Sequence, residues 1–344
     1  LEYSNESDSP VRTILSENVK INNGKGVIGI IGAGNFTKMV IVPKLKKIGA
    51  KLKYIASASG LTAKSLANKY GFEYTTSDYK EILNDKSVDT VFITTRHNKH
   101  ASMVLESLKS EKHVFVEKPL AININELDLI FDFYQKNSVE KILHVGYNRR
   151  FSPHAIKVKD LLGDANDINI VATMNAGYIP PDVWVHDMKI GGGRIIGEAC
   201  HFIDLMIFIT GSLVESINMS VLGKTSSENS DNTIITIKFR NGSQGVINYF
   251  ANGSKKYPKE RIEIYSQNKT LVIDDFKKTE GYGFKGFYNL KTKLDKGHVN
   301  QFKFFLNSVE EGTSSLIPFE EIYNSSKAVI CAIESLKSKK TIKI

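Results

Sequence analysis

The first part of the chain alternates between short apolar runs and longer segments in which apolar side chains recur at helical spacing. The apolar runs suit strands that are covered on both faces, and they lie at residues 27–31, 52–58, 90–94, 113–116 and 142–145. The helical patterns between them lie at residues 39–48, 62–70, 101–110 and 125–135. Because strands and helices alternate, we predict an α/β domain with a doubly wound parallel sheet over residues 26–146.

Beyond residue 146 the strand-like runs follow one another more closely. They lie at residues 168–174, 216–222, 233–239, 245–250, 261–265 and 270–273, and helical patterns lie at residues 154–162, 198–210, 299–311 and 319–336. Asn241-Gly242 between two of the runs is a strong hairpin signal. We predict an α+β domain with a mainly antiparallel sheet over residues 147–344. Residues 1–25 are polar and are expected to be a tail or linker.

Composition limits the class of protein. The hydrophobic share of 41% and charged share of 24% are those of a folded protein. No apolar run is long enough to cross a membrane. The net charge of +9 comes from lysines spread along the chain, so we expect a solvated surface and no nucleic-acid partner. Cys200 and Cys331 form no C-x-x-C pattern, which excludes a cysteine-rich zinc site and suits the cytoplasm.

The first strand runs into the glycine turn Gly32-Ala33-Gly34-Asn35-Phe36-Thr37, which also opens the first helix. Gly32 permits a tight turn, and Gly34 lets the backbone approach a pyrophosphate held at the helix N-terminus. We therefore expect Gly32, Gly34, Asn35 and Phe36 to bind NAD or NADP. The alternative is a strand-to-helix turn with no ligand, since Thr37 replaces the third glycine of the pattern. The place of the turn in the first strand–helix unit favours the dinucleotide.

The end of the second strand bears on the choice between NAD and NADP. Residues 55–60 contain no acidic side chain that would bind a ribose 2′-hydroxyl, which leaves room for a 2′-phosphate. No arginine is present there to hold that phosphate. We expect Ser57 and Ser59 to contact either cofactor, with a slight preference for NADP; alternatively, the serines merely end a strand.

Candidate catalytic residues come from two distant segments. Glu117-Lys118-Pro119 follows the strand at residues 113–116, at the sheet edge that faces the ligand crevice. Lys118 is placed to exchange the proton of a substrate hydroxyl, and Pro119 permits a cis peptide bond. A helix after residues 191–193 carries Glu198 and His201, and His201 could share that proton. Alternatively, Lys118 lies in a surface turn, His201 is a core histidine and Glu198 faces the solvent.

Several motifs together resemble the Gfo/Idh/MocA oxidoreductases. They are the glycine turn, Thr95-Arg96-His97-Asn98-Lys99-His100, Glu117-Lys118-Pro119, and the glycines 191–193 leading to His201-Phe202-Ile203-Asp204. The resemblance implies a Rossmann domain followed by a domain whose open sheet often makes oligomer contacts. It implies catalytic roles for Lys118 and His201. It also places cofactor contacts at Thr95, Arg96, His97, His100 and Glu117.

The chain departs from the family pattern at two positions. Many dehydrogenases of the family have an aspartate four residues before the catalytic histidine, where this chain has Gly197. Glu198 lies one residue later, and a shift of one residue turns a helical side chain by about 100°. Arg96 replaces the proline of the family's Thr-Pro motif.

Further sequence segments resemble a subgroup of bi-domain oxidoreductases. In that subgroup a zinc-type alcohol dehydrogenase-like domain precedes a Gfo/Idh/MocA domain, and the resemblance is to this C-terminal half. The segments lie at residues 146–151, 175–177 and 194–201. The resemblance implies an upstream fused domain and work on sugars or nucleotide sugars for surface polysaccharides. Candidate substrate contacts, which could equally pack between domains or subunits, are Tyr147, Arg150, Tyr178, Trp184, His186 and Arg194.

The combined prediction is an NAD(P)-dependent oxidoreductase that moves a hydride to or from a hydroxyl carbon of a sugar, nucleotide sugar or cyclitol. We expect a homo-oligomer and no metal. Two alternatives are a non-catalytic dinucleotide-binding sensor, which the glycine at position 197 favours, and an accessory module of a larger protein.

Overall fold

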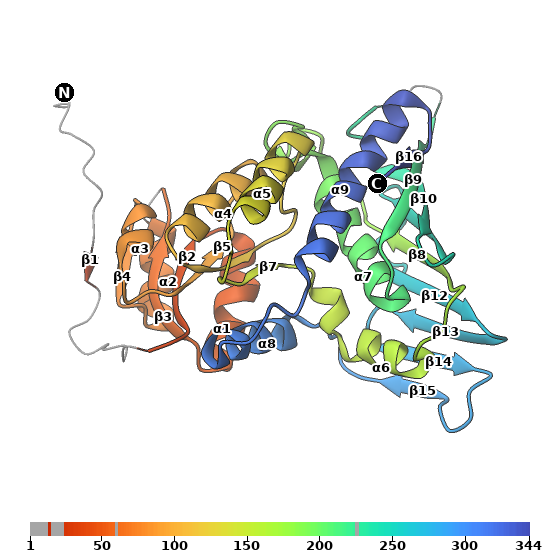
Figure 1. Cartoon of the computed structure of the whole chain (residues 1–344), viewed down its shortest axis with the longest axis horizontal. Coiled ribbons are helices and arrows are strands. Elements are labelled where there is room, and N and C mark those ends of the chain that lie inside the picture. Colours follow the sequence, from red (N-terminus) through yellow and green to blue (C-terminus); the bar gives the residue numbers. More distant parts are fainter. Residues whose placement is uncertain (1–12, 15–23, 59–60, 224–226) are drawn as a thin grey trace.

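The computed structural model describes residues 13–14, 24–58, 61–223 and 227–344. These residues form two sheets, each covered by helices, with the helices α5, α7 and α9 between them (Figure 1). The first sheet contains β1 to β7 and the second contains β8 to β16. The division of the strands into an α/β part and a later strand-rich part therefore agrees with the prediction.

The first sheet has the order β1-β4-β3-β2-β5-β6-β7, in which six strands run parallel and β1 joins β4 antiparallel. Its strands are β1 (Thr13–Ile14), β2 (Val27–Ile31), β3 (Lys51–Ala56), β4 (Tyr74–Thr76), β5 (Thr90–Ile93), β6 (His113–Val116) and β7 (Leu143–Val145). Every residue of β2 and β5 is buried, because helices cover both faces. The prediction of a doubly wound sheet is confirmed.

Helices connect these strands, and all but α3 follow the predicted apolar spacing. They are the π-helical turn Thr37–Ile41, α1 (Val42–Lys47), α2 (Leu61–Tyr70), α3 (Lys80–Asn84), α4 (His100–Lys109) and α5 (Ile124–Lys136). Asn123 caps α5 by accepting a hydrogen bond from the backbone N–H of Glu126. The short elements β4 and α3 were not predicted, because three to five residues carry too little periodicity to stand out.

The second sheet has the order β15-β14-β13-β12-β8-β11-β10-β9-β16, and only β8 and β11 pair in parallel. Its strands are β8 (Asn169–Asn175), β9 (Val214–Val221), β10 (Asn232–Phe239), β11 (Gln244–Phe250), β12 (Glu260–Ser266), β13 (Lys269–Asp274), β14 (Lys278–Tyr282), β15 (Asn289–Lys291) and β16 (Ile342–Lys343). Burial alternates along β10, so one face packs on helices and the other stays open. The predicted open, mainly antiparallel sheet and the hairpin at Asn241-Gly242 are confirmed.

The remaining helices are α6 (Pro153–Leu162), α7 (Cys200–Thr210), α8 (His298–Glu311) and α9 (Phe319–Ser338). Helices α7 and α9 pack against each other beside the second sheet. Helix α8 returns to the first sheet (Figure 1), where Phe302 lies edge-on to Phe115 at a centroid distance of 5.3 Å. The chain therefore crosses three times between the two halves, after β7, before α8 and before α9, which fixes the walls of the space between them. Within the described residues, no helix combines the length and apolar character needed to span a membrane.

Candidate active site

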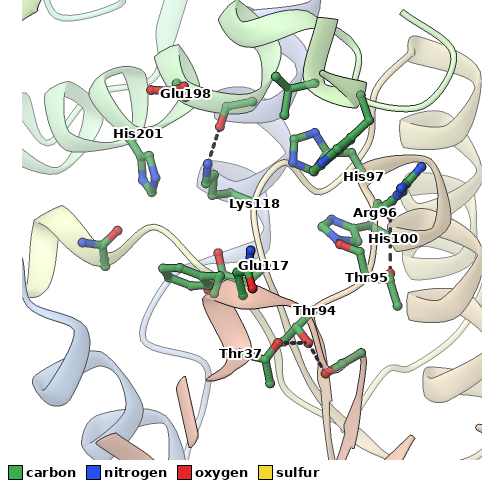
Figure 2. Close-up of a pocket in the computed structure, with 18 of the residues that line it drawn as sticks. Thr37, Thr94, Thr95, Arg96, His97, His100, Glu117, Lys118, Glu198 and His201 are labelled. Atoms are coloured by element: carbon green, nitrogen blue, oxygen red, sulfur yellow. Dashed lines mark hydrogen bonds between the residues drawn. The ribbon is translucent and has the colours of Figure 1, made fainter. Parts of the chain in front are cut away.

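A cavity of about 950 Å³ lies where the carboxyl ends of β2, β5 and β6 face the second domain. Its volume is at the upper end of the range for small-molecule and cofactor sites. Figure 2 shows residues from both halves of the chain around it. Most of the predicted site residues line it, namely Gly32, Gly34, Asn35, Phe36, Ser57, Thr95, Arg96, His97, His100, Glu117, Lys118, Trp184, Arg194, Glu198 and His201.

The glycine turn forms one end of the cavity. At Gly32 the φ angle is +112°, and a Cβ atom would lie 2.8 Å from the backbone of Thr94, so only glycine fits. At Gly34 a Cβ atom would meet nothing within 4 Å, so this backbone borders open space. The two glycines therefore do what a dinucleotide turn requires, one making the bend and the other leaving room for a phosphate group.

Thr37, at the place of the third glycine, has a structural role in this turn. Its hydroxyl donates to the hydroxyl oxygen of Thr94 at 2.8 Å, and Thr94 donates to the carbonyl oxygen of Gly32 at 2.9 Å. Figure 2 shows this chain of hydrogen bonds below the cavity. The substitution that weakened the motif in the sequence thus ties the turn to β5.

Lys118 projects into the cavity from the end of β6 (Figure 2). Its Nζ donates a hydrogen bond of 2.6 Å to the carbonyl oxygen of Gly197, across the boundary between the two halves. The Lys118–Pro119 peptide bond is cis, as the sequence permits. His100 lies beneath this turn, with Nδ1 2.7 Å from the carbonyl oxygen of Pro119 and Nε2 3.2 Å from that of Thr95. The buried His100 therefore helps to position Lys118.

Two further groups beside Lys118 have strongly shifted pKa values. Burial raises the pKa of Glu117 to about 7, against the opposing charge of Lys118. Burial lowers the pKa of His97 to about 3, and the charges of Lys118 and His100 act in the same direction. Near neutral pH, His97 is therefore uncharged, while Glu117 exchanges between its charged and neutral forms.

His201, in α7, lies on the other side of Lys118 in Figure 2. Its side chain is buried, and its Nδ1 has no hydrogen-bond partner among the described residues. Burial holds the pKa of His201 well below its usual value, and the positive charges of Arg149 and Lys118 contribute to this shift. A neutral imidazole in the same cavity as an amine can exchange a proton with a bound hydroxyl.

Glu198 lines the cavity from the π-helical turn Ile195–Ala199, just before α7. Its carboxylate accepts a hydrogen bond of 3.3 Å from Arg194, whose guanidinium also donates to the carbonyl oxygen of Gly177 and to Asp231. Both residues are thus already held by protein groups. Trp184 stands edge-on to His97 at a centroid distance of 4.8 Å and forms part of the cavity wall.

Four predicted substrate contacts do not line the cavity, which corrects the sequence prediction. Tyr147 is fully buried, and its hydroxyl lies 3.0 Å from that of Ser326. The guanidinium of Arg150 donates to both carboxylate oxygens of Asp204, at 2.6 and 3.0 Å, and to Glu321. Tyr178 is 64% exposed, and His186 is the last residue of the 3₁₀ turn Trp184–His186, in which only Trp184 and Val185 line the cavity.

The same short turn that buries Arg150 turns Arg149 toward the cavity. Arg149 forms a two-point ion pair with Glu260, with both N–O distances at 2.8 Å, and Lys296 donates to the same carboxylate at 2.5 Å. These three residues line the cavity together with Asn148, Met174, Lys259 and His298, none of which we predicted. Adjacent arginines in a 3₁₀ turn point to different sides, so the sequence did not show which one faces the ligand.

At the cofactor end, Ser57, Ala58 and Thr62 line the cavity. Ser59, the other predicted serine, lies outside the described residues. No acidic side chain lines this end among the described residues.

Comparison with known proteins assigns the chain to a class. Residues 27–147 match the model of an oxidoreductase family with an NAD-binding Rossmann fold, GFO/IDH/MocA, and residues 159–272 match the GFO/IDH/MocA C-terminal domain. The chain therefore belongs to the Gfo/Idh/MocA family of oxidoreductases, and its first domain is an NAD-binding Rossmann domain.

Particular relatives agree with this assignment along most of the chain. A myo-inositol 2-dehydrogenase of Thermotoga maritima is 26% identical over 92% of this chain and 98% of its own. A levoglucosan dehydrogenase in complex with NADH and levoglucosan is 20% identical, with a TM-score of 0.78, over 92% of this chain and 98% of its own. An oxidoreductase domain protein of Kribbella flavida has a TM-score of 0.81, over 93% of this chain and 99% of its own, at 20% identity.

Proposed function

We propose that the protein transfers a hydride between a nicotinamide cofactor and a secondary alcohol or ketone carbon of a sugar or cyclitol. The observation that carries this proposal is that Lys118 and His201 line the same cavity as the glycine turn, although they come from different halves of the chain. The myo-inositol and levoglucosan dehydrogenases among the relatives support this substrate class.

The residues of the chain fit a bound dinucleotide. The open space beside Gly34 would take the pyrophosphate, and Asn35 and Phe36 continue that surface. Thr95, Arg96 and Glu117 would lie along the path from the phosphates to the reactive end. When bound, the nicotinamide ring accepts or supplies the hydride.

Loss of a hydride from an alcohol carbon leaves a ketone only if the hydroxyl proton also departs. Lys118 would take that proton through Nζ, which the carbonyl oxygen of Gly197 holds in the cavity. His201, which lines the same cavity, would share the proton through its neutral imidazole. In the reverse direction the same groups return a proton to the oxygen as the hydride reaches carbon. Glu198, which lines the same cavity, would take part in this proton exchange as a third catalytic group.

The finer points of substrate and setting are also proposals. Arg149, Lys259 and Lys296 line the cavity together with the carboxylate of Glu260, and this excess of positive charge supports a substrate with a phosphate or carboxylate, such as a nucleotide sugar for surface polysaccharide. The unpaired cysteines Cys200 and Cys331 support a reducing compartment, the cytoplasm. The open sheet face supports a homo-oligomer, and the segments that resemble the subgroup support fusion to an upstream dehydrogenase-like domain.

Cofactor choice follows from the end of β3. The Rossmann match and the NADH-bound neighbour support NAD(H). The absence of acidic side chains among the described residues near Ser57 leaves NADP open, with the slight preference stated above. Steady-state rates with each cofactor, on one substrate, would separate the two.

The experiment that tests the function is a substrate panel. Purified protein is incubated with NAD⁺ or NADP⁺ and with inositols, hexoses, anhydrosugars, sugar acids and nucleotide sugars, and absorbance of the reduced cofactor is followed. We expect turnover with at least one polyol class. Tight NADH binding without turnover across the panel would favour a dinucleotide sensor, for which the missing side chain at position 197 is the supporting observation. Failure to bind either cofactor would favour an accessory module.

A further inference from the structure

Gly197 leaves a gap in the wall of the active site, and the ring of His97 fills it. A Cβ atom at position 197 would lie 3.0 Å from Cε1 of His97 and 3.6 Å from its Nδ1. This is closer than Cβ atoms usually approach a neighbour, so a larger residue at position 197 requires the ring to shift by a few tenths of an ångström or more. The two positions are 100 residues apart in sequence but share one volume beside Lys118, whose Nζ is bonded to the Gly197 carbonyl oxygen.

The ring of His97 is held in one orientation. Its Nδ1 lies 2.7 Å from the carbonyl oxygen of Gly191, and Trp184 stands edge-on to it at 4.8 Å. A carbonyl oxygen can only accept a hydrogen bond, so Nδ1 carries the hydrogen. Since burial keeps the pKa of the ring at about 3, the ring is neutral, and its lone pair is on Nε2.

The Nε2 atom is available to a ligand. It has no hydrogen-bond partner among the described residues. It is also absent from the buried polar atoms that lack a partner, so solvent can reach it. His97 lines the cavity beside Lys118 (Figure 2), and Trp184 packs edge-on against its ring. A fixed acceptor beside the amine that handles the substrate proton is placed to select a hydroxyl of the substrate.

We propose that His97 binds the substrate, its Nε2 accepting a hydrogen bond from a hydroxyl group next to the reacting carbon. The substrate would then meet three nitrogen-containing side chains, those of His97, Lys118 and His201. Position 197 contributes no side chain, because it is a glycine. This inference rests on the proposed function and adds to it a specificity-determining residue that we had assigned to the cofactor.

Two matched variants separate the two nitrogens of the ring. In His97→Asn the side-chain amide can still donate to the Gly191 carbonyl oxygen, as Nδ1 does, but nothing reaches the place of Nε2. In His97→Gln the longer side chain brings an amide oxygen to that place and loses the anchor. We expect His97→Asn to lower kcat/KM about tenfold to a hundredfold, as for loss of one buried hydrogen bond, and His97→Gln to retain more activity. NADH affinity should change less than about twofold in both.

The shared volume gives a second test. Gly197→Asp alone should disturb His97 and lower both kcat/KM and thermal stability. Adding His97→Asn should restore part of both, so the double variant loses less than the sum of the single losses. Wild-type kcat/KM in His97→Asn would overturn the proposal, as would a loss of NADH affinity as large as the loss of activity.

A binding measurement keeps this proposal separate from the proposed function. Nitrogen NMR of ¹⁵N-histidine-labelled protein loaded with NADH, with the His97 signals assigned through His97→Asn, would be recorded with and without myo-inositol. We expect the Nε2 signal of His97 to move toward the hydrogen-bonded range while its Nδ1 signal stays in place. An unchanged Nε2 signal would overturn the role of His97. Absence of turnover by the wild-type protein on the whole panel would instead count against the proposed function.

Discussion

The two ends of the cavity are built in different ways. The cofactor end comes from a continuous segment, β2 and the turn after it, with Thr94 as its main distant contact. The substrate end is assembled from Lys118, Arg149, His201 and Lys296, which are brought together by the packing of two domains. One end is thus determined by local backbone geometry, and the other depends on ion pairs and helices that lie far apart in sequence.

The largest expected effect tests the local end, with two glycines as a matched pair. Gly32→Ala forces a Cβ atom to within 2.8 Å of the Thr94 backbone at a φ of +112°, so we expect loss of the native turn, lower stability and at least a hundredfold weaker NADH binding. Gly34→Ala has free space for its Cβ and should fold with wild-type stability, while weakening NADH. Thermal melts and NADH fluorescence titration measure both. Equal stability of the two variants would contradict this account of the turn.

The next effect tests the assembled end through Arg150. Arg150→Met leaves the buried carboxylate of Asp204 without its partner, and we expect a loss of about 3–5 kcal/mol in the free energy of unfolding. Arg150→Met with Asp204→Leu should regain most of it, as measured by urea denaturation. The folded fraction of each variant should keep its KM, because Arg150 does not line the cavity. A large rise in KM without loss of stability would return Arg150 to the substrate site.

The smallest effect is a pH dependence at the junction of the two ends. The pKa of Glu117 is about 7 in the folded protein and 4.5 in a free side chain, so its stabilising contribution is full below about pH 4.5 and is lost as pH rises through 7. Glu117→Gln removes this loss, so its free energy of unfolding should rise relative to that of the wild type across this window. Urea denaturation of the cofactor-free proteins at several pH values measures the difference. Parallel curves would contradict the assigned ionisation.

The pattern of successful predictions follows the same division. Strand and helix periodicity predicted the parallel sheet, the Asn-Gly pair predicted the hairpin at Asn241-Gly242, and the glycine spacing predicted the first strand-to-helix turn, because each depends on neighbouring residues. Motifs at the end of a strand and within a helix pointed to Lys118 and His201, which the structure brings into one cavity and whose catalytic roles stay predictions.

Tyr147, Arg150, Tyr178 and His186 were misplaced, because nothing local tells whether such a side chain faces a cavity, an ion-pair partner or solvent. Lys259 and Lys296 were missed for the same reason. Lys259 directly precedes β12, and Lys296 lies just before α8. Only the packing of the second sheet and α8 brings these two residues close to Arg149.

The most direct test of the account is a comparison of Lys118→Ala with the wild type in single turnover, at saturating substrate, with NADH affinity measured on the same samples. We expect the hydride-transfer rate to fall by about 10²–10⁴-fold, the range for loss of a general acid or base, while NADH affinity and melting temperature stay close to wild type. A Lys118→Ala rate equal to that of the wild type would contradict the assignment of the cavity as an active site.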